Sequence, residues 1–155
     1  PLNPTTLALA YGAKGQVSPT SPMGMKSGTS PYGNIARPLN PTTLALAYGA
    51  TFVARTFSRE RDMVSDLITR AIQHKGFSFI HDLSPCVVFN KDVTYGSVNS
   101  VTAQLPEEHD ILDRSNAMSL AESTEPVYQG LFFQEKIPSF DDHVKQVKDG
   151  LNKSD

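Results

Sequence analysis

Two groups of polar residues have side-chain types that could do chemistry. His81, Asp82 and Ser84 are the residue types of a hydrolytic triad. Neighbouring residues of a strand point to opposite faces of a sheet, however, so this spacing argues against a triad. The run 107–110 (EEHD) has metal-ligating types, but an acidic cluster of this kind is more typical of a solvated loop. Neither group predicts a catalytic function by itself.

The charged residues are unevenly distributed along the chain. The first acidic residue is Glu60, and the basic residues before it are Lys14, Lys26, Arg37, Arg55 and Arg59. The remaining 96 residues carry nine basic and sixteen acidic side chains. A loop-rich segment without acids suits an anionic ligand such as a diphosphate or a carboxylate; alternatively, the five cations form an ordinary solvated surface. The charge density is too low for a nucleic-acid-binding surface.

The composition is that of a soluble globular protein. With 155 residues, of which 39% are hydrophobic and 19% charged, the chain can bury one core. No apolar run reaches the roughly 20 residues that span a bilayer, and no basic flank indicates a signal peptide. The single cysteine, Cys86, rules out an internal disulfide and predicts a cytoplasmic location.

Thirteen residues occur twice without a change. The sequence PLNPTTLALAYGA occupies residues 1–13 and again residues 38–50. Solenoid units vary in sequence and stack at least three times, so this pair is a duplication and not a structural repeat. The second copy has the signals of a native helix: Asn40 can cap it, Pro41 suits its first position, and Gly49 can end it. We therefore interpret the first copy as the inserted one.

The middle of the chain has a strand–helix–strand pattern. Residues 51–55 (TFVAR) and 77–83 (FSFIHDL) are β-prone. The apolar residues between them recur at helical spacing over residues 59–75, with Ser58 as the expected N-cap and Gly76 as the terminator. The pattern predicts a βαβ unit with parallel strands and hence an α/β fold.

Ligands of such sheets bind beyond the carboxyl ends of the strands, where residues 55–58 and 84–86 lie. The regions on either side of the βαβ unit are less regular. Residues 14–37 combine four glycines and three prolines, which predicts a long structured loop. After residue 90 we expect only a short helix, a strand and a terminal helix, at about residues 113–122, 127–134 and 140–151.

Five stretches of the chain resemble one known family. They are residues 14–22 (KGQVSPTSP), 31–34 (PYGN), 49–55 (GATFVAR), 74–77 (HKGF) and 83–90 (LSPCVVFN). Together they resemble the β subunit of 2-oxoacid:ferredoxin oxidoreductases. The similarity is dense from residue 14 to residue 90 and looser to about residue 144. The Ser-Pro-Thr-Ser-Pro form of the loop is similar to enzymes that act on 2-oxoglutarate or on a broad range of 2-oxoacids.

The resemblance implies a partial thiamine-diphosphate-binding fold with a parallel βαβ core and an irregular C-terminal region. It implies an oxidoreductase that uses thiamine diphosphate, Mg²⁺ and a [4Fe–4S] cluster. The family decarboxylates a 2-oxoacid oxidatively with coenzyme A and passes the electrons to ferredoxin. The expected partners are therefore an α subunit, ferredoxin, coenzyme A and a 2-oxoacid, with no nucleic acid and no membrane.

The resemblance also assigns site residues. Lys14 is the expected catalytic residue, beside the cofactor and the substrate. The expected cofactor-binding residues are Tyr11, Gly12, Gly15 and Gln16. Cys86, in the Ser-Pro-Cys segment, is the expected iron–sulfur ligand, although a cluster needs four ligands and the other three are absent. Without the resemblance, Lys14 would be interpreted as the surface lysine of a turn and Cys86 as a small buried hydrophobe.

Part of the family site is missing from this chain. No Gly-Asp-Gly segment is present, and residues 1–59 offer no carboxylate for Mg²⁺. Tyr11 and Gly12 coincide with the Tyr-Gly that precedes Lys-Gly-Gln in the family, so the inserted copy replaces the strand that carries the metal and diphosphate ligands. The expected regions are the inserted copy at 1–13, the C-terminal part of the cofactor-binding domain at 14–90, and the C-terminal extension of the β subunit at 91–155.

Two interpretations of function remain open at the level of sequence. The first is a β-subunit fragment that needs its missing N-terminal part and an α subunit for activity. The second is an inactive truncated subunit that acts at most as an interaction module. Another thiamine-diphosphate enzyme, such as a decarboxylase, would share the fold but would not explain the Ser-Pro-Cys segment.

Overall fold

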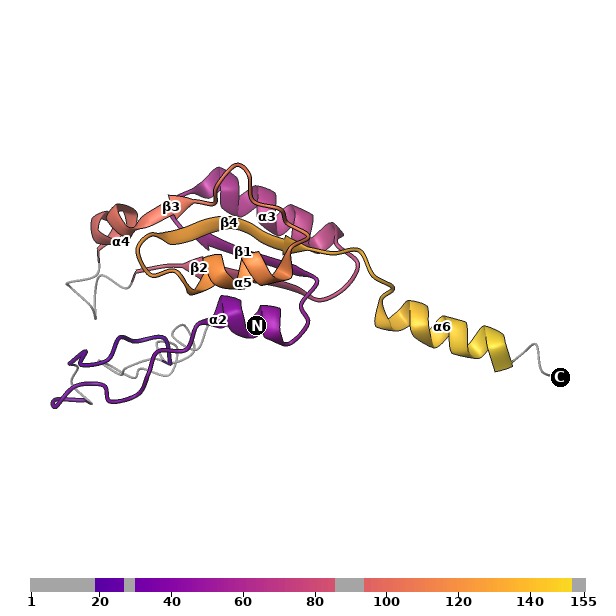
Figure 1. The fold of residues 1–155 in the computed structure, drawn as a ribbon, viewed down its shortest axis with the longest axis horizontal. Coiled ribbons are helices and arrows are strands. Elements are labelled where there is room, and N and C mark those ends of the chain that lie inside the picture. The colour runs from indigo at the N-terminus through magenta and orange to yellow at the C-terminus, as the bar shows by residue number, and fades with distance from the viewer. Residues whose placement is uncertain (1–18, 27–29, 86–93, 152–155) are drawn as a thin grey trace.

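Four strands form one sheet. In the computed structural model, which describes residues 19–26, 30–85 and 94–151, the strands are β1 (Phe52–Phe57), β2 (Ser78–Leu83), β3 (Thr102–Gln104) and β4 (Val127–Gln134). Their order across the sheet is β2-β1-β4-β3 (Figure 1). The pairs β1–β2 and β3–β4 are parallel, whereas β1 and β4 are antiparallel. The predicted α/β class is confirmed.

The central motif is the predicted βαβ unit. Strand β1 leads into helix α3 (Arg61–Gln73), and the chain returns as β2. The two strands pair in parallel from Phe52 opposite Ser78 to Phe57 opposite Leu83. A parallel pair needs such a crossover because the chain has to travel back along the sheet before it can start the next strand. The carboxyl ends of β1 and β2 therefore lie side by side at one edge of the sheet.

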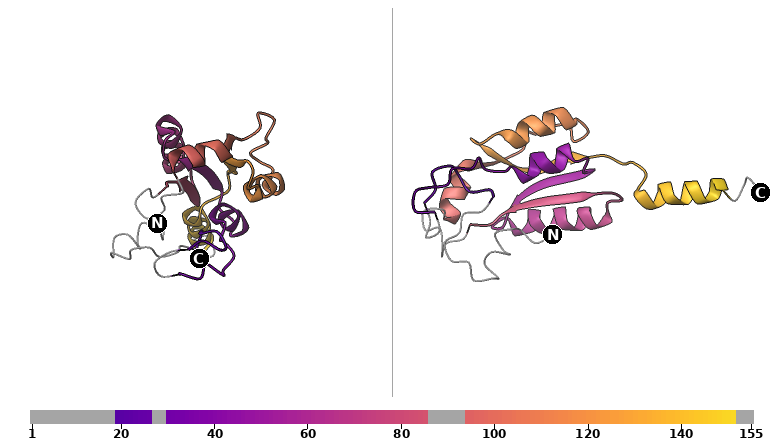
Figure 2. Two further views of the ribbon diagram at one scale, coloured as in Figure 1. Left: turned by 90° about the vertical axis from the view of Figure 1, so that its left-hand side faces the viewer. Right: turned by 90° about the horizontal axis from the view of Figure 1, so that it is seen from below.

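Helices cover both faces of the sheet (Figure 2). Helices α2 (Pro41–Ala47) and α5 (Arg114–Glu122) lie on one face, and α3 lies on the other. The core between α2, α5 and the sheet includes Leu46, Val53 and Phe132, which are almost completely buried. The core beneath α3 is built around Phe52 and Leu67.

Helix α2 has the boundaries that its sequence predicts. The side-chain oxygen of Asn40 accepts hydrogen bonds from the backbone amides of Thr42 (3.1 Å) and Thr43 (3.3 Å), and Pro41 occupies the first turn. Gly49 follows the helix with φ +80°, the left-handed conformation that favours glycine. These local signals suffice because each one satisfies backbone groups at a helix end.

The predicted start of α3 is wrong. Ser58 does not cap the helix, which begins at Arg61 after Glu60. The backbone amide of Ser58 instead donates to the carbonyl oxygen of Leu83 (3.1 Å), and so prolongs the pairing of β1 with β2. A turn then intervenes, in which the amide of Glu60 donates to the carbonyl of Phe57 (2.8 Å). A tertiary bond to the neighbouring strand thus accompanies a start that is two residues, about half a turn, later than predicted.

The C-terminal region contains the three predicted elements and two more. Helix α5, strand β4 and helix α6 (Phe140–Leu151) match the expected ranges. The sequence did not indicate α4 (Tyr95–Val101) or β3. Helix α4 has only seven residues, and β3 has three residues that form a strand only because β4 lies beside them. Helix α6 extends away from the sheet (Figure 1). No helix among the described residues has the length and apolar character needed to cross a membrane.

The described part of the glycine- and proline-rich loop is held together by Asn34. Its side-chain amide donates to the carbonyl oxygen of Ser21 (2.9 Å), and its backbone amide donates to that of Met25 (2.9 Å). The backbone carbonyl of Asn34 accepts from Gly24 (2.7 Å). The expectation of a structured loop is therefore confirmed for residues 19–26 and 30–37.

Two glycines with positive φ, Gly76 and Gly49, allow a matched test of how closely the fold packs around a glycine. We expect Gly76→Ala to lower the free energy of unfolding by about 2–4 kcal/mol, because φ is +138° and a new Cβ would collide with the Thr51 hydroxyl, which is bonded to His74. Gly49→Ala meets no atom within 4 Å and should cost about 1–2 kcal/mol from backbone strain alone. Chemical denaturation of both variants measures the difference; equal losses would contradict it.

Candidate functional site

The residues assigned by resemblance lie outside the described part of the structure. They are Tyr11, Gly12, Lys14, Gly15, Gln16 and Cys86. Their roles therefore stay predictions. The structure does describe the sheet edge from which the chain continues to Cys86, since β1 and β2 end beside each other there and residue 85 directly precedes Cys86. That edge is where ligands of parallel sheets bind.

Polar side chains gather at this edge on the face covered by α3. Thr56 of β1 lies opposite Asp82 of β2 in the register, and its hydroxyl donates to the Asp82 carboxylate across 2.7 Å. Gln129 of β4 lies on the same face, because it stands two residues before Leu131, which packs beneath α3. Gln129 is only 6% exposed. We call Thr56, Ser58, Asp82 and Gln129 the carboxyl-edge cluster.

Two buried oxygens of the carboxyl-edge cluster have no hydrogen-bond partner among the described residues. They are the hydroxyl oxygen of Ser58 and the side-chain carbonyl oxygen of Gln129. Buried polar atoms are nearly always bonded, so each of these oxygens leaves a place for a donor. Helix α3 begins three residues after Ser58, at Arg61, and no side chain caps its first turn. The edge thus offers a hydroxyl, an amide and uncapped backbone N–H groups.

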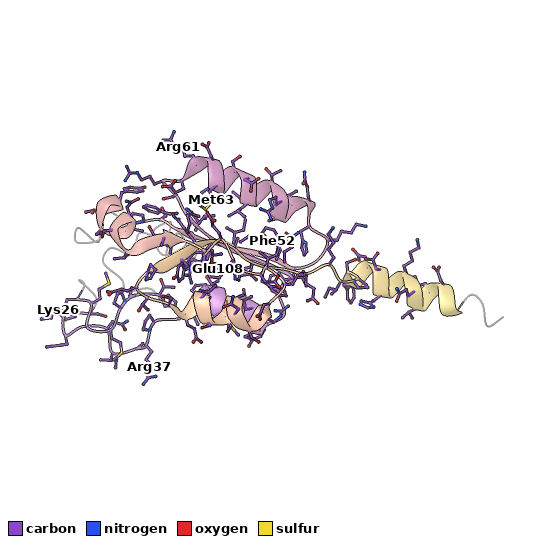
Figure 3. The ribbon with its side chains drawn as sticks, turned by 45° about the horizontal axis from the view of Figure 1, so that its top comes forward. Lys26, Arg37, Phe52, Arg61, Met63 and Glu108 are labelled. Atoms are coloured by element: carbon purple, nitrogen blue, oxygen red, sulfur yellow. The ribbon has the colours of Figure 1, made fainter. Side chains whose placement is uncertain are left out.

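Apolar side chains fill the space between α3 and the sheet. Met63 points from the first turns of α3 towards the sheet, whereas Arg61 points away from it, and Phe52 lies in the interior beneath the helix (Figure 3). Met63 and Leu67 pack over Phe52 in the buried core on this face. This apolar core lies on the same face of the sheet as the carboxyl-edge cluster.

The carboxyl-edge cluster is suited to binding and not to acid–base or nucleophilic catalysis. Its one carboxylate, Asp82, already accepts a bond from Thr56. No group of three or more His, Cys, Asp or Glu residues able to hold a metal occurs among the residues that the structure describes. In the 107–110 run, His109 contacts the carbonyl oxygen of Phe132 (2.8 Å), and Asp110 accepts from the amide of Leu112 (2.8 Å). His109 thus contacts the strand β4, and Asp110 takes part in a local turn.

The opposite face of the same strands holds a buried cation. Arg55 is 3% exposed and is not a surface charge, unlike Lys26 and Arg37, which lie exposed in the loop (Figure 3). Its guanidinium donates to the hydroxyl of Thr42 (3.2 Å), the side-chain oxygen of Asn40 (3.3 Å) and the carbonyls of Ala121 (3.0 Å) and Tyr128 (3.1 Å). No carboxylate within the described residues forms an ion pair with it.

The groups that surround the Arg55 guanidinium are neutral, and this environment affects its pKa. Its guanidinium carbon lies 5.2 Å from the centre of the Phe132 ring, a cation–π distance. Burial lowers the pKa of Arg55 to about 10. The residue remains charged at neutral pH, and all of its stabilisation comes from oxygens and one aromatic face. Four of its five N–H donors are already used and the side chain is buried, so Arg55 is not placed to bind the anionic ligand that the charge distribution suggests.

Thr42 connects Arg55 to His81. The Thr42 oxygen accepts from Nε of Arg55, and so its own proton is available for Nδ1 of His81, which lies 3.2 Å away. This arrangement favours the neutral His81 tautomer with Nδ1 unprotonated. Burial and, secondarily, the charge of Arg55 lower the pKa of His81 to about 4. His81 is therefore a neutral structural residue at physiological pH.

The structure confirms that His81 and Asp82 do not form a triad. His81 bonds to Thr42 on the α2 face, whereas Asp82 bonds to Thr56 on the α3 face. Sequence reasoning missed Gln129 and the Thr56–Asp82 pair. The signal that could have found Gln129 is a lone polar residue at an alternating, inward position of an otherwise apolar strand. The bond between Thr56 and Asp82 depends on the β1–β2 register, which the sequence does not reveal.

The Thr42 bridge gives a sharp test. We expect Thr42→Val to lower the free energy of unfolding by about 1–3 kcal/mol, because it leaves the buried Nε–H of Arg55 without an acceptor while keeping the side-chain shape. Thr42→Ser should restore most of the loss. The matched control is Thr43→Val, whose hydroxyl only returns to the carbonyl of Asn40. Equal effects at the two positions, measured by urea denaturation, would refute the bridge.

The lowered pKa of His81 predicts how stability depends on pH. The unfolded chain binds a proton near pH 6.5 and the folded protein only near pH 4, so His81 makes stability fall as the pH falls through this window. We expect His81→Gln to flatten the decrease. His74, whose pKa is lowered by desolvation and then by Lys136, contributes in the same direction and is the comparator. Unfolding midpoints measured between pH 7 and pH 4 test this prediction. If His81→Gln leaves the dependence of stability on pH unchanged, the assignment to His81 is contradicted.

Two protein-family models match consecutive parts of the chain. The thiamine pyrophosphate enzyme, C-terminal TPP binding domain, matches residues 8–81. The model for the C terminal of the pyruvate ferredoxin oxidoreductase beta subunit matches residues 86–149. The first match confirms the partial thiamine-diphosphate-binding fold that the resemblance implies, with the βαβ unit inside it.

Individual relatives agree with the family models. The 2-oxoglutarate synthase subunit KorB of Methanocaldococcus jannaschii is 32% identical over 148 residues, which cover 91% of this chain and 53% of the relative. The 2-oxoacid:ferredoxin oxidoreductase subunit beta of a Sulfolobus species is 33% identical over 150 residues, covering 87% of this chain and 49% of the relative. The chain thus spans about half the length of these curated relatives.

A solved structure shows the same likeness in three dimensions. It is a 2-oxoglutarate:ferredoxin oxidoreductase from Magnetococcus marinus with 2-oxoglutarate, coenzyme A and succinyl-CoA bound. The likeness has a TM-score of 0.86 at 35% identity and covers 90% of this chain and 48% of that one. Sequence models, curated relatives and fold agree, and the chain belongs to the 2-oxoacid:ferredoxin oxidoreductase β-subunit family.

Proposed function

We propose that the chain is the C-terminal part of a β subunit that takes part in the coenzyme A-dependent oxidative decarboxylation of 2-oxoacids, with electron transfer to ferredoxin. The observation that carries the proposal is the likeness to the Magnetococcus enzyme, which extends over 90% of the chain. That enzyme was solved with 2-oxoglutarate, coenzyme A and succinyl-CoA. Relatives named 2-oxoglutarate synthase and the Ser-Pro-Thr-Ser-Pro loop both support 2-oxoglutarate as the substrate.

The chain does not by itself contain the donors that the family's groups require. A [4Fe–4S] cluster needs four ligands, usually cysteines, and Cys86 is the single cysteine of the sequence. For Mg²⁺, the sequence before Glu60 offers no carboxylate. Thiamine diphosphate would depend on Lys14, Gly15 and Gln16, whose roles are proposals. The cluster and the metal therefore do not fit this chain alone, and we assign no chemical step to them.

The chain's own contribution is a scaffold for a larger assembly. Strand β2 is the last strand on its side of the described sheet, and its residues are half-buried. It has apolar residues on both faces, with Phe79 on the α2 side and Ile80 on the α3 side, as is typical of a strand inside a parallel sheet. An unpaired edge of this kind supports a role next to further chain, such as the half of the relatives that this chain lacks, or an α subunit.

The alternative proposal is a catalytically inactive subunit that acts at most as an interaction module. Two observations favour it for the isolated polypeptide: the chain spans about half of its relatives, and it holds one of the four cysteines that a cluster needs. The two proposals differ in what happens when the missing sequence is supplied.

The test is to co-express the full chain with a family α subunit and to assay 2-oxoglutarate- and coenzyme A-dependent reduction of a viologen dye. We expect no activity for the chain as it stands. A second chain, in which the sequence upstream of Tyr11 is replaced by that of a relative's β subunit, should be active and contain iron. Its Cys86→Ser variant should lose most of both, because one cluster ligand is removed.

If the extended chain stays inactive and free of iron, the enzymatic proposal fails. Calorimetric titration of the present chain with thiamine diphosphate and Mg²⁺ tests the alternative separately. The inactive-module proposal predicts no heat of binding. Micromolar binding by the present chain would contradict it.

A further inference from the structure

Helix α2 is held by contacts that depend on its sequence. Arg55 donates to the side-chain oxygens of Asn40 and Thr42, and the amide of Asn40 donates to the carbonyl of Ala121 (2.7 Å). On the other side, Arg114 donates to the backbone carbonyl of Leu46 (2.7 Å). The Leu46 side chain, 1% exposed, fills the core between α2, α5 and the sheet. We call the surface that receives these groups the α2 site.

Residues 1–13 repeat every group that the α2 site binds. Asn3, Thr5 and Leu9 stand at the positions of Asn40, Thr42 and Leu46, and the intervening residues are identical as well. The side-chain contacts of the site therefore cannot distinguish the two copies. A ligand that makes equal contacts in two states does not shift the equilibrium between them, so another factor has to decide which copy is bound.

We propose that the α2 site has two interchangeable occupants in the same chain, residues 38–50 and residues 1–13. The second copy dominates in the intact protein because Ala50 is separated from the start of β1 by Thr51 alone. Docking of the first copy forces residues 14–50 to form a closed loop. The entropy of loop closure grows only slowly with length, so this cost is finite, and the first copy takes over when the second is damaged.

The exchange has a topological consequence for residues 14–37, which connect the two copies. When residues 38–50 are docked, this connecting segment precedes the helix in the α2 site. When residues 1–13 are docked, the same segment follows that helix. The copy that occupies the α2 site thus determines whether the glycine- and proline-rich segment comes before or after the docked helix.

The experiment damages one copy at a time in the full chain. Leu46→Asp places a charge in the core and expels the second copy from the α2 site. We expect this variant to remain folded, with a melting temperature at least about 5 °C above that of the Leu46→Asp/Leu9→Asp double variant. The matched control is Leu46→Asp/Leu7→Asp. Leu7 corresponds to Leu44, which is 41% exposed, and the control should keep the rescue.

Hydrogen exchange followed by mass spectrometry reports the occupant directly. Residues 4–10 should become protected in Leu46→Asp, and this protection should disappear when Leu9→Asp is added. Identical behaviour of the single and double variants, including failure of both to fold, would overturn the proposal, because Leu9 would then have no influence. A rescue that weakens on tenfold dilution together with loss of a dimer would also overturn it, since the occupant would come from a second copy.

Discussion

The structure depends on the burial of one guanidinium group. Arg55 sits at the centre of the sheet without a carboxylate partner among the described residues, so neutral oxygens have to replace its hydration. These oxygens come from α2 and its cap, from the last turn of α5 and from β4. The carbonyl of Ala121 belongs to the negative end of α5, which favours a cation. A single charge thus fixes two helices and a strand against β1.

The alternation of side chains along β1 and β2 separates two environments. Arg55 and His81 face α2, where the hydroxyl of Thr42 links them and keeps His81 neutral. Thr56 and Asp82 face α3, where they form the bonded part of the carboxyl-edge cluster. The first environment has its donors and acceptors matched, and it is structural. The second contains buried oxygens without partners among the described residues, and it is the part of the fold suited to a ligand.

Much of the fold could be predicted because its signals are local. Asn40, Pro41 and Gly49 set the ends of α2 through backbone groups only a few residues away. Features that depend on a neighbouring strand and have only a weak local signal were not predicted. Strand β3 forms because β4 lies beside it, and Ser58 fails as a cap because its amide bonds to Leu83 of another strand. The hydrogen-bond partners of the site residues also depend on neighbouring strands, so they were not predicted.

The family, the βαβ unit and the presence of two identical thirteen-residue segments follow from the sequence alone, because motifs, hydrophobic periodicity and identity are all properties of short stretches of chain. Which polar residues meet depends on the tertiary structure. Arg55 meets Thr42 across 13 positions, Ala121 across 66 and Tyr128 across 73. Such contacts follow from strand register and helix packing, which depend on the whole chain at once. The sequence places Arg55 in a segment suited to an anionic ligand, whereas the tertiary structure buries its charge at the centre of the fold.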